Sequence, residues 1–139
     1  MKKRSRKTFF TLIEVVVVIV ILMTLASIAV PTYMNYTKKA NIGAAKSQVK
    51  LLVDALNGYR LDVGSYPDES YGLQCLIENL EEKEKWAGPY LSPKVPQDPW
   101  GNDYVYVCPG EHGDFDVYSY GADGEEGGEG ENADITSWD

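Results

Sequence analysis

A run of apolar residues from Phe9 to Val30 limits what this chain of 139 residues can fold into. About 20 such residues are enough to cross the hydrocarbon core of a bilayer. Five basic residues precede the run, and positive residues resist translocation, so we expect a cytoplasmic N-terminus and an exported C-terminal part. Roughly 109 residues follow the run, which suffices for one small domain with a single core.

Glu14 is the only charged residue inside this run. A carboxylate well inside a bilayer costs roughly 2.5 to 3.5 kcal/mol on insertion scales, so it tends to persist where a cation pairs with it. The alternative is that Glu14 reaches the cytoplasmic face or stays protonated, and then it has no role.

The charge, the single histidine and the motifs of the chain argue against several classes of function. The net charge is −8, and from Asp98 to the end there are twelve acidic residues and no Lys or Arg, which argues against binding nucleic acid. His112 is the only histidine, so multi-histidine metal sites and histidine triads are excluded, and in PGEHGD it is expected to be a turn residue. We find no nucleophile-plus-base arrangement, phosphate loop or redox motif, so an enzyme is the least favoured class.

The spacing of apolar residues predicts one amphipathic helix from Thr32 to Asp62, with Gly64 and Pro67 as its stop signal. Its apolar face is expected to carry Ala45, Val49, Leu52, Val53, Leu56 and Tyr59. Together with the apolar run it would form a rod on the order of 75 Å; the alternative is two helices hinged at Pro31.

Beyond this helix we expect a second helix over Tyr71–Glu82 and then a β-hairpin. Its strands alternate over Asp103–Val107 and Phe115–Tyr120. We expect three aromatic residues of this part to fill the core: Trp100, Tyr104 and Tyr106. We expect Asp98 to fix a turn before Pro99. Two cysteines, Cys75 and Cys108, form either one disulfide or two buried free thiols.

An acidic, glycine-rich segment, SYGADGEEGGEGENADI, lies near the C-terminus. Carboxylates on a flexible backbone suit Ca²⁺, which takes six to eight oxygen ligands. The spacing is not that of an EF-hand, and a solvated acidic loop is the alternative.

Several motifs together resemble the major pseudopilin of type II secretion, the G-type subunit of the type IV pilin superfamily. FTLIE opens the apolar run and places a sequence in the superfamily. The motifs closer to the G-type are YRLDVGSYP, GLQCLIENL, GPYL, PQDPWGNDY, PGEHGD, DVYSYGADG and the closing ADITSW.

The resemblance implies an α+β, type IV pilin-like fold: a long N-terminal helix packed on a small antiparallel β-sheet head with a C-terminal calcium loop. Its divisions would be a basic leader over 1–9, a transmembrane and assembly helix over 10–31, an amphipathic continuation over 32–62, and a head over 63–139 with the acidic loop at 120–134. The function implied is that of a non-enzymatic subunit that polymerises into a periplasmic pseudopilus.

The resemblance also implies processing and partners. A prepilin peptidase would cut between Phe9 and Phe10 and methylate the new N-terminus, whose amino group would pair with Glu14 of a neighbouring subunit. The family usually has glycine before the cut, so either the peptidase accepts Phe9 or the leader is retained. The partners implied are further copies of the chain, minor pseudopilins, the inner-membrane assembly platform, and the inner membrane itself before assembly.

One structural Ca²⁺ is implied in the acidic loop. The resemblance implies that the carbonyl of Tyr120 and the side chains of Asp123 and Asp134 are ligands. Glu125 and Glu126 are further candidate ligands that the resemblance does not rank.

Two other functions remain open from the sequence. One is a type IV pilin or competence pseudopilin. The other is a signal-anchored extracytoplasmic calcium-binding domain, for which Ser27-x-Ala29 would be a signal-peptidase site.

Overall fold

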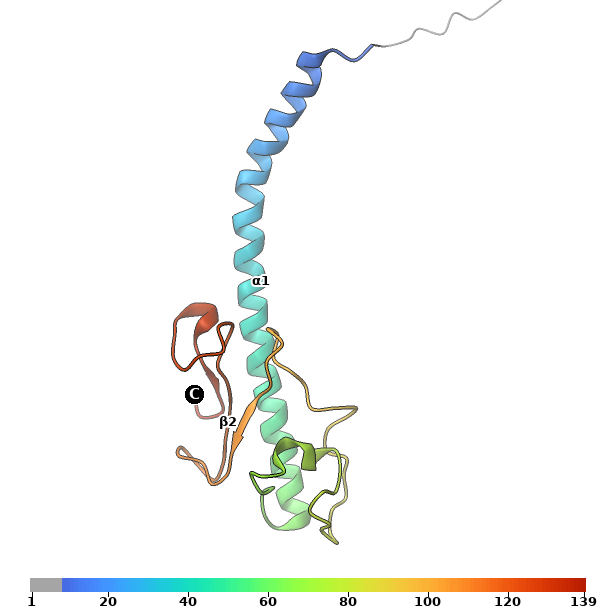
Figure 1. The fold of residues 1–139 in the computed structure, drawn as a ribbon, viewed down its shortest axis with the longest axis vertical. Helices are drawn as coiled ribbons and strands as arrows, with labels where there is room; N and C mark the ends of the chain where they lie inside the picture. The colour runs from blue at the N-terminus through green and yellow to red at the C-terminus, as the bar shows by residue number, and fades with distance from the viewer. Residues whose placement is uncertain (1–8) are drawn as a thin grey trace, which may run out of the picture. The chain divides into compact units, whose positions relative to one another are not determined.

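The computed structural model describes residues 9–139, so the basic part of the expected leader lies outside the described residues. The elements in chain order are the helix α1 (Leu12–Val63), the 3₁₀ helix η1 (Gly72–Leu76), the strands β1 (Val105–Val107) and β2 (Asp116–Ser119), the 3₁₀ helix η2 (Gly130–Asn132) and the strand β3 (Ile135–Thr136) (Figure 1). The chain divides into two compact units, one up to Thr37 and a head unit from Lys38 to Asp139.

The helix α1 continues through Pro31 and ends where the sequence predicts. Gly64 follows it with φ +94°, a left-handed conformation that glycine adopts without strain, and its N–H donates to the carbonyl of Arg60 at 2.8 Å. This cap satisfies a carbonyl that would otherwise lack a partner, so the helix stops one residue after Asp62.

The core of the head unit forms on the apolar face of α1. Its buried residues are Ala45, Val49, Leu52, Ala55, Leu56 and Tyr59, while Val53 is half-buried. Tyr59 has no exposed surface, and its hydroxyl donates to the carboxylate of Glu81. Burial is the main cause that raises the pKa of Tyr59, and the hydrogen bond to Glu81 raises this pKa further.

The buried residues confirm the predicted amphipathic face of α1 and add Ala55 to it.

The predicted hairpin is confirmed, and a third strand completes the sheet. β1 and β2 pair antiparallel with Tyr106 opposite Val117, and β2 pairs antiparallel with β3, with Ser119 opposite Ile135. Tyr106, Val117 and Ile135 are buried against the helix-based core. The small antiparallel sheet with a long N-terminal helix is the predicted fold class.

The helix expected over Tyr71–Glu82 is wrong in type and length. Only Gly72–Leu76 is helical, as a 3₁₀ turn, because the carbonyl of Leu76 accepts the N–H groups of Tyr90 and Leu91 at 2.7 and 3.2 Å instead of continuing a helix. Leu80, near the end of the expected helix, is 38% exposed.

Two further expectations can be checked in the head. Asp98 fixes its turn, since one carboxylate oxygen accepts the N–H groups of Trp100 and Asn102 at 3.0 and 2.8 Å. Both cysteines are free thiols: Cys75 is buried and Cys108 is half-buried.

Candidate assembly stem and metal loop

The first unit offers an apolar helix surface that no described residue of the chain covers. Every residue of α1 from Leu12 to Thr37 is exposed, and the large apolar side chains from Leu12 to Met34 are between 45% and 82% exposed. A helix this apolar has the length and composition to cross a membrane. A contiguous apolar surface of this size marks contact with lipid or with other protein.

Glu14 lies in the first turn of α1, where its position has a local explanation that the sequence reasoning missed. Its backbone N–H donates to the hydroxyl of Thr11 at 3.4 Å, so Thr11-x-x-Glu14 forms one half of a capping box. A carboxylate in the first turn is also favoured by the helix dipole. Within residues 9–139 the Glu14 carboxylate has neither an ion pair nor a hydrogen-bond partner from another side chain.

The expected cleavage site, between Phe9 and Phe10, precedes the start of α1. Both side chains are exposed, at 84% and 80%, and neither residue belongs to a helix or strand. The peptide bond between them is thus accessible and free of helical hydrogen bonds.

The acidic loop, residues 120–134, is closed by contacts between its two ends. The N–H of Ala122 donates to the carbonyl of Glu131 at 2.9 Å. Gly121 has φ +71°, and a Cβ there would lie 2.8 Å from the carbonyl oxygen of Ala133, so only glycine allows the two ends to come this close. Backbone carbonyls and carboxylates are thereby gathered around a glycine-rich turn.

The three expected Ca²⁺ ligands are partly brought together. Tyr120 and Asp134 line one cavity of about 270 Å³, together with Glu126, while Asp123 is exposed and is not among its lining residues. The Asp134 carboxylate accepts the N–H of Gly127 at 3.1 and 3.2 Å. No cluster of three metal-binding side chains occurs within residues 9–139. The donor set consists of oxygen only, which fits Ca²⁺ chemically.

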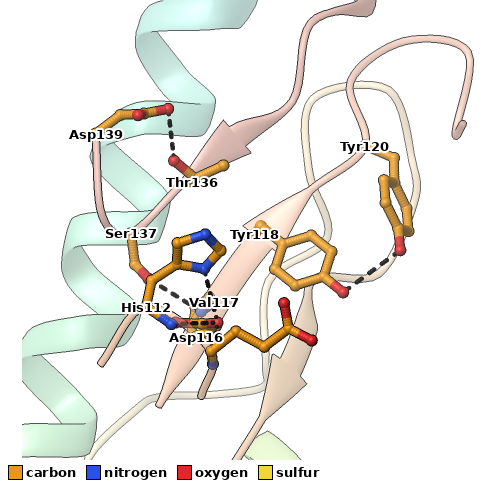
Figure 2. Close-up of polar contacts among 9 residues, drawn as sticks. His112, Asp116, Val117, Tyr118, Tyr120, Thr136, Ser137 and Asp139 are labelled. Atoms are coloured by element: carbon orange, nitrogen blue, oxygen red, sulfur yellow. Dashed lines mark hydrogen bonds and ion pairs between the residues drawn. The ribbon is translucent and has the colours of Figure 1, made fainter. Parts of the chain in front are cut away.

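A buried carboxylate next to this cavity was not anticipated from the sequence. Asp116 is 4% exposed, and its carboxylate accepts a hydrogen bond from the backbone N–H of Glu111 at 2.8 Å. The ring nitrogen Nδ1 of His112 lies 3.1 Å from the same carboxylate, as Figure 2 shows. The His112 ring stacks on Trp138 at 3.9 Å between centroids. The C-terminal segment is thus joined to the turn between β1 and β2.

The pKa of Asp116 reflects two opposing effects. Burial raises it, but hydrogen bonds from the ring of His112 and from the backbone N–H groups of Glu111 and His112 together outweigh burial. The net result is a pKa below the ordinary value for aspartate. Asp116 therefore acts as an ionised acceptor that fixes the turn.

The comparisons with known proteins agree on one family. The family model described as type II secretion system (T2SS), protein G, matches residues 32–138. Type II secretion system core protein G of Vibrio cholerae serotype O1 is 45% identical over 99% of this chain and 96% of its own length, and that of Pseudomonas aeruginosa is 43% identical over 99% of each. The crystal structure of the major pseudopilin from the type 2 secretion system of enterohaemorrhagic Escherichia coli matches with a TM-score of 0.61 and 33% identity, over 76% of this chain and 92% of that one.

Proposed function

Because the chain belongs to the type II secretion system protein G family, in which it is a structural subunit of the pseudopilus, we propose that it enters the fibre through its exposed apolar stem. The stem is the segment from Phe10 to Pro31. Family membership favours secretion over the pilin and competence alternatives. The role is structural, and we assign no catalysis to the chain.

The observation that carries this proposal is that every residue of the stem is exposed. Its apolar side chains find no partner within the described part of the chain, so lipid must cover them before assembly and other copies afterwards. The five basic residues before Phe9 favour an inner-membrane orientation with a cytoplasmic N-terminus and an extracytoplasmic head.

We propose that a prepilin peptidase removes the leader between Phe9 and Phe10 and methylates the amine that it frees. The exposed, non-helical position of this peptide bond supports cleavage despite Phe9. The amine would then pair with Glu14 of an adjacent copy, where two charges of opposite sign compensate each other in an apolar bundle. Minor pseudopilins and the inner-membrane assembly platform would be the other partners.

We further propose one structural Ca²⁺ in the acidic loop. The carbonyl of Tyr120 and the carboxylates of Asp123 and Asp134 would hold it, and the ion would supply positive charge between carboxylates that otherwise repel one another. The oxygen-only donor set and the close contact of Gly121 with Ala133 support this assignment.

N-terminal mass analysis of the protein extracted from its native host tests the proposal. We expect a polypeptide that begins at methylated Phe10. A start at Val30 would instead indicate a soluble secreted domain, and a start at Met1 an uncut anchor; either result would contradict prepilin processing.

A further inference from the structure

The acidic loop already contacts α1 of its own chain through one glutamate. Glu131 accepts hydrogen bonds from Asn41 at 3.4 Å and from the indole N–H of Trp100 at 3.1 Å, and it lies 3.8 Å from the amine of Lys38. These contacts place the end of the loop beside residues 38–41 of the helix. The other loop glutamates, Glu125, Glu126 and Glu129, are exposed and form no ion pair within residues 9–139.

Three lysines lie on a different side of the same helix stretch. Lys39, Lys46 and Lys50 are separated by seven and four residues, so at about 100° per residue they fall within roughly 40° of one another and form a basic stripe. All three are exposed, and within the described part of the chain none forms an ion pair. The same geometry turns Lys46 and Lys50 about 80° to 120° away from Lys38, so the loop that pairs with Lys38 does not neutralise them.

A groove runs beside this stripe. Its volume is about 490 Å³, and Lys46 and Lys50 line it next to the apolar side chains of Ile42, Val53 and Ile135. Asp134 and Asp139 also line the groove, yet neither lies within 4.0 Å of a lysine amine. The groove therefore combines apolar side chains with two lysines that form no direct ion pair within the described part of the chain.

We propose that this groove and the basic stripe receive the acidic loop of a second copy of this chain in the fibre. Every copy carries both surfaces, so the contact is head-to-tail and can repeat along a polymer. Lys46 and Lys50 lie eight and twelve residues beyond Lys38, which corresponds to about 12 and 18 Å along α1. A copy displaced by this distance toward the C-terminal end of α1 brings its acidic loop level with the two lysines.

The loop suits this groove in charge and in bulk. Glu125, Glu126 and Glu129 alternate with glycines, which add no side chain volume, and the three glutamates match the three lysines in number. Complementary charges favour one register and one orientation over others, because a wrong register places like charges together. The inference rests on the fibre assembly proposed above.

Zero-length crosslinking of fibres built from mixed ¹⁴N- and ¹⁵N-labelled full-length protein tests the contact directly. A carbodiimide joins an amine to a carboxylate only when they touch. We expect crosslinked peptides that join Lys46 or Lys50 to Glu125, Glu126 or Glu129 and that carry one label from each copy. Links with a single label only, or fibres in which these lysines link to no loop glutamate, would overturn the proposal.

Charge reversal supplies the second test. We expect Lys46→Glu/Lys50→Glu and Glu125→Lys/Glu129→Lys each to lower fibre yield by about tenfold or more, since like charges then meet in the contact. The chain with all four changes should regain most of the yield, because every contact again pairs opposite charges.

The matched control is Lys85→Glu/Lys94→Glu, which makes the same charge change at two exposed lysines away from the groove. It should assemble as wild type. Wild-type yield from Lys46→Glu/Lys50→Glu, equal loss in the control, or no recovery in the fourfold variant while the head melts normally would each refute the contact. Absence of fibres from the wild-type chain would refute fibre assembly itself.

Discussion

Substitution of Glu14 by glutamine separates the role that its place in the first turn of α1 gives this residue from the assembly role that we propose for it. In the first role the carboxylate of Glu14, in the first turn of α1, interacts favourably with the helix dipole. In the second, proposed role it would neutralise the amine of Phe10 on a neighbouring copy. Glutamine keeps the length of glutamate and the backbone N–H that donates to Thr11 at 3.4 Å, but it carries no charge.

The two roles differ in size and in reach. Loss of the dipole interaction costs about 0.3 to 1 kcal/mol and stays within the first turn. The buried residues of α1 begin at Ala45, far beyond Glu14, so the head should melt at an unchanged temperature. Removal of one partner of a buried charge pair costs about 2 to 5 kcal/mol, which corresponds to roughly 30-fold or more in the equilibrium for adding a subunit.

We therefore expect Glu14→Gln and Glu14→Ala to insert into the membrane and to fold their heads normally, while both lower fibre yield about 30-fold or more. Fibres sheared from cells and quantified against total protein measure the yield. If Glu14→Gln assembles like wild type and only Glu14→Ala fails, the length and polarity of the side chain explain the residue, and the charge-pair account is refuted.

Three other predictions concern the head. Ca²⁺ at 100 times its Kd should stabilise it by about 2.7 kcal/mol, or roughly 10 °C in Tm, relative to excess EDTA; equal Tm values would exclude a structural ion. Asp116→Asn should lower the free energy of unfolding at neutral pH by about 1 to 3 kcal/mol. The pKa of Asp116 in the folded protein lies below its value in the unfolded chain, which is about 3.9. The contribution of Asp116 to the free energy of unfolding is therefore complete above about pH 3.9, and it is lost as the pH falls through the folded pKa. Urea titrations at pH 7 and pH 3 should therefore differ less for Asp116→Asn than for wild type, whereas Asp103→Asn, at an exposed position, should behave as wild type. Finally, burial raises the pKa of Cys75 to about 11, so a maleimide at pH 8 should label Cys108 and leave Cys75 unmodified; equal labelling would contradict the buried thiol.

The sequence predicts those parts of the fold that local patterns determine. The apolar face from Ala45 to Tyr59 follows from its spacing, and the end of α1 follows from Gly64, because both depend on residues close together in the chain. The hairpin follows from alternation in the same way. The family resemblance, carried by motifs along the whole chain, supplied the function that periodicity alone does not give.

The parts that sequence reasoning missed depend on distant partners. The helix expected after Tyr71 is shorter because Leu76 bonds to Tyr90 and Leu91, which lie far along the chain. The strand β3 has two residues, Ile135–Thr136, too few for a pattern, and it exists only because β2 offers it an edge. The cluster of His112, Asp116 and Trp138 likewise joins two separate segments.

The capping of α1 by the Thr11 hydroxyl could have been found from the sequence. Thr11-x-x-Glu14 before an apolar run is a recognised start signal for a helix. The pairing of Glu14 with a neighbouring amine came from the family resemblance, and it stays a prediction because the partner amine would belong to another copy.

Solid-state NMR on fibres grown from two differently labelled pools tests the central claim most directly. One pool carries ¹⁵N at Phe10 and the other carries ¹³C at the Glu14 side chain. The account predicts magnetisation transfer between the Phe10 amine and the Glu14 carboxylate, which can arise only between copies. Fibres that form without this transfer would contradict it.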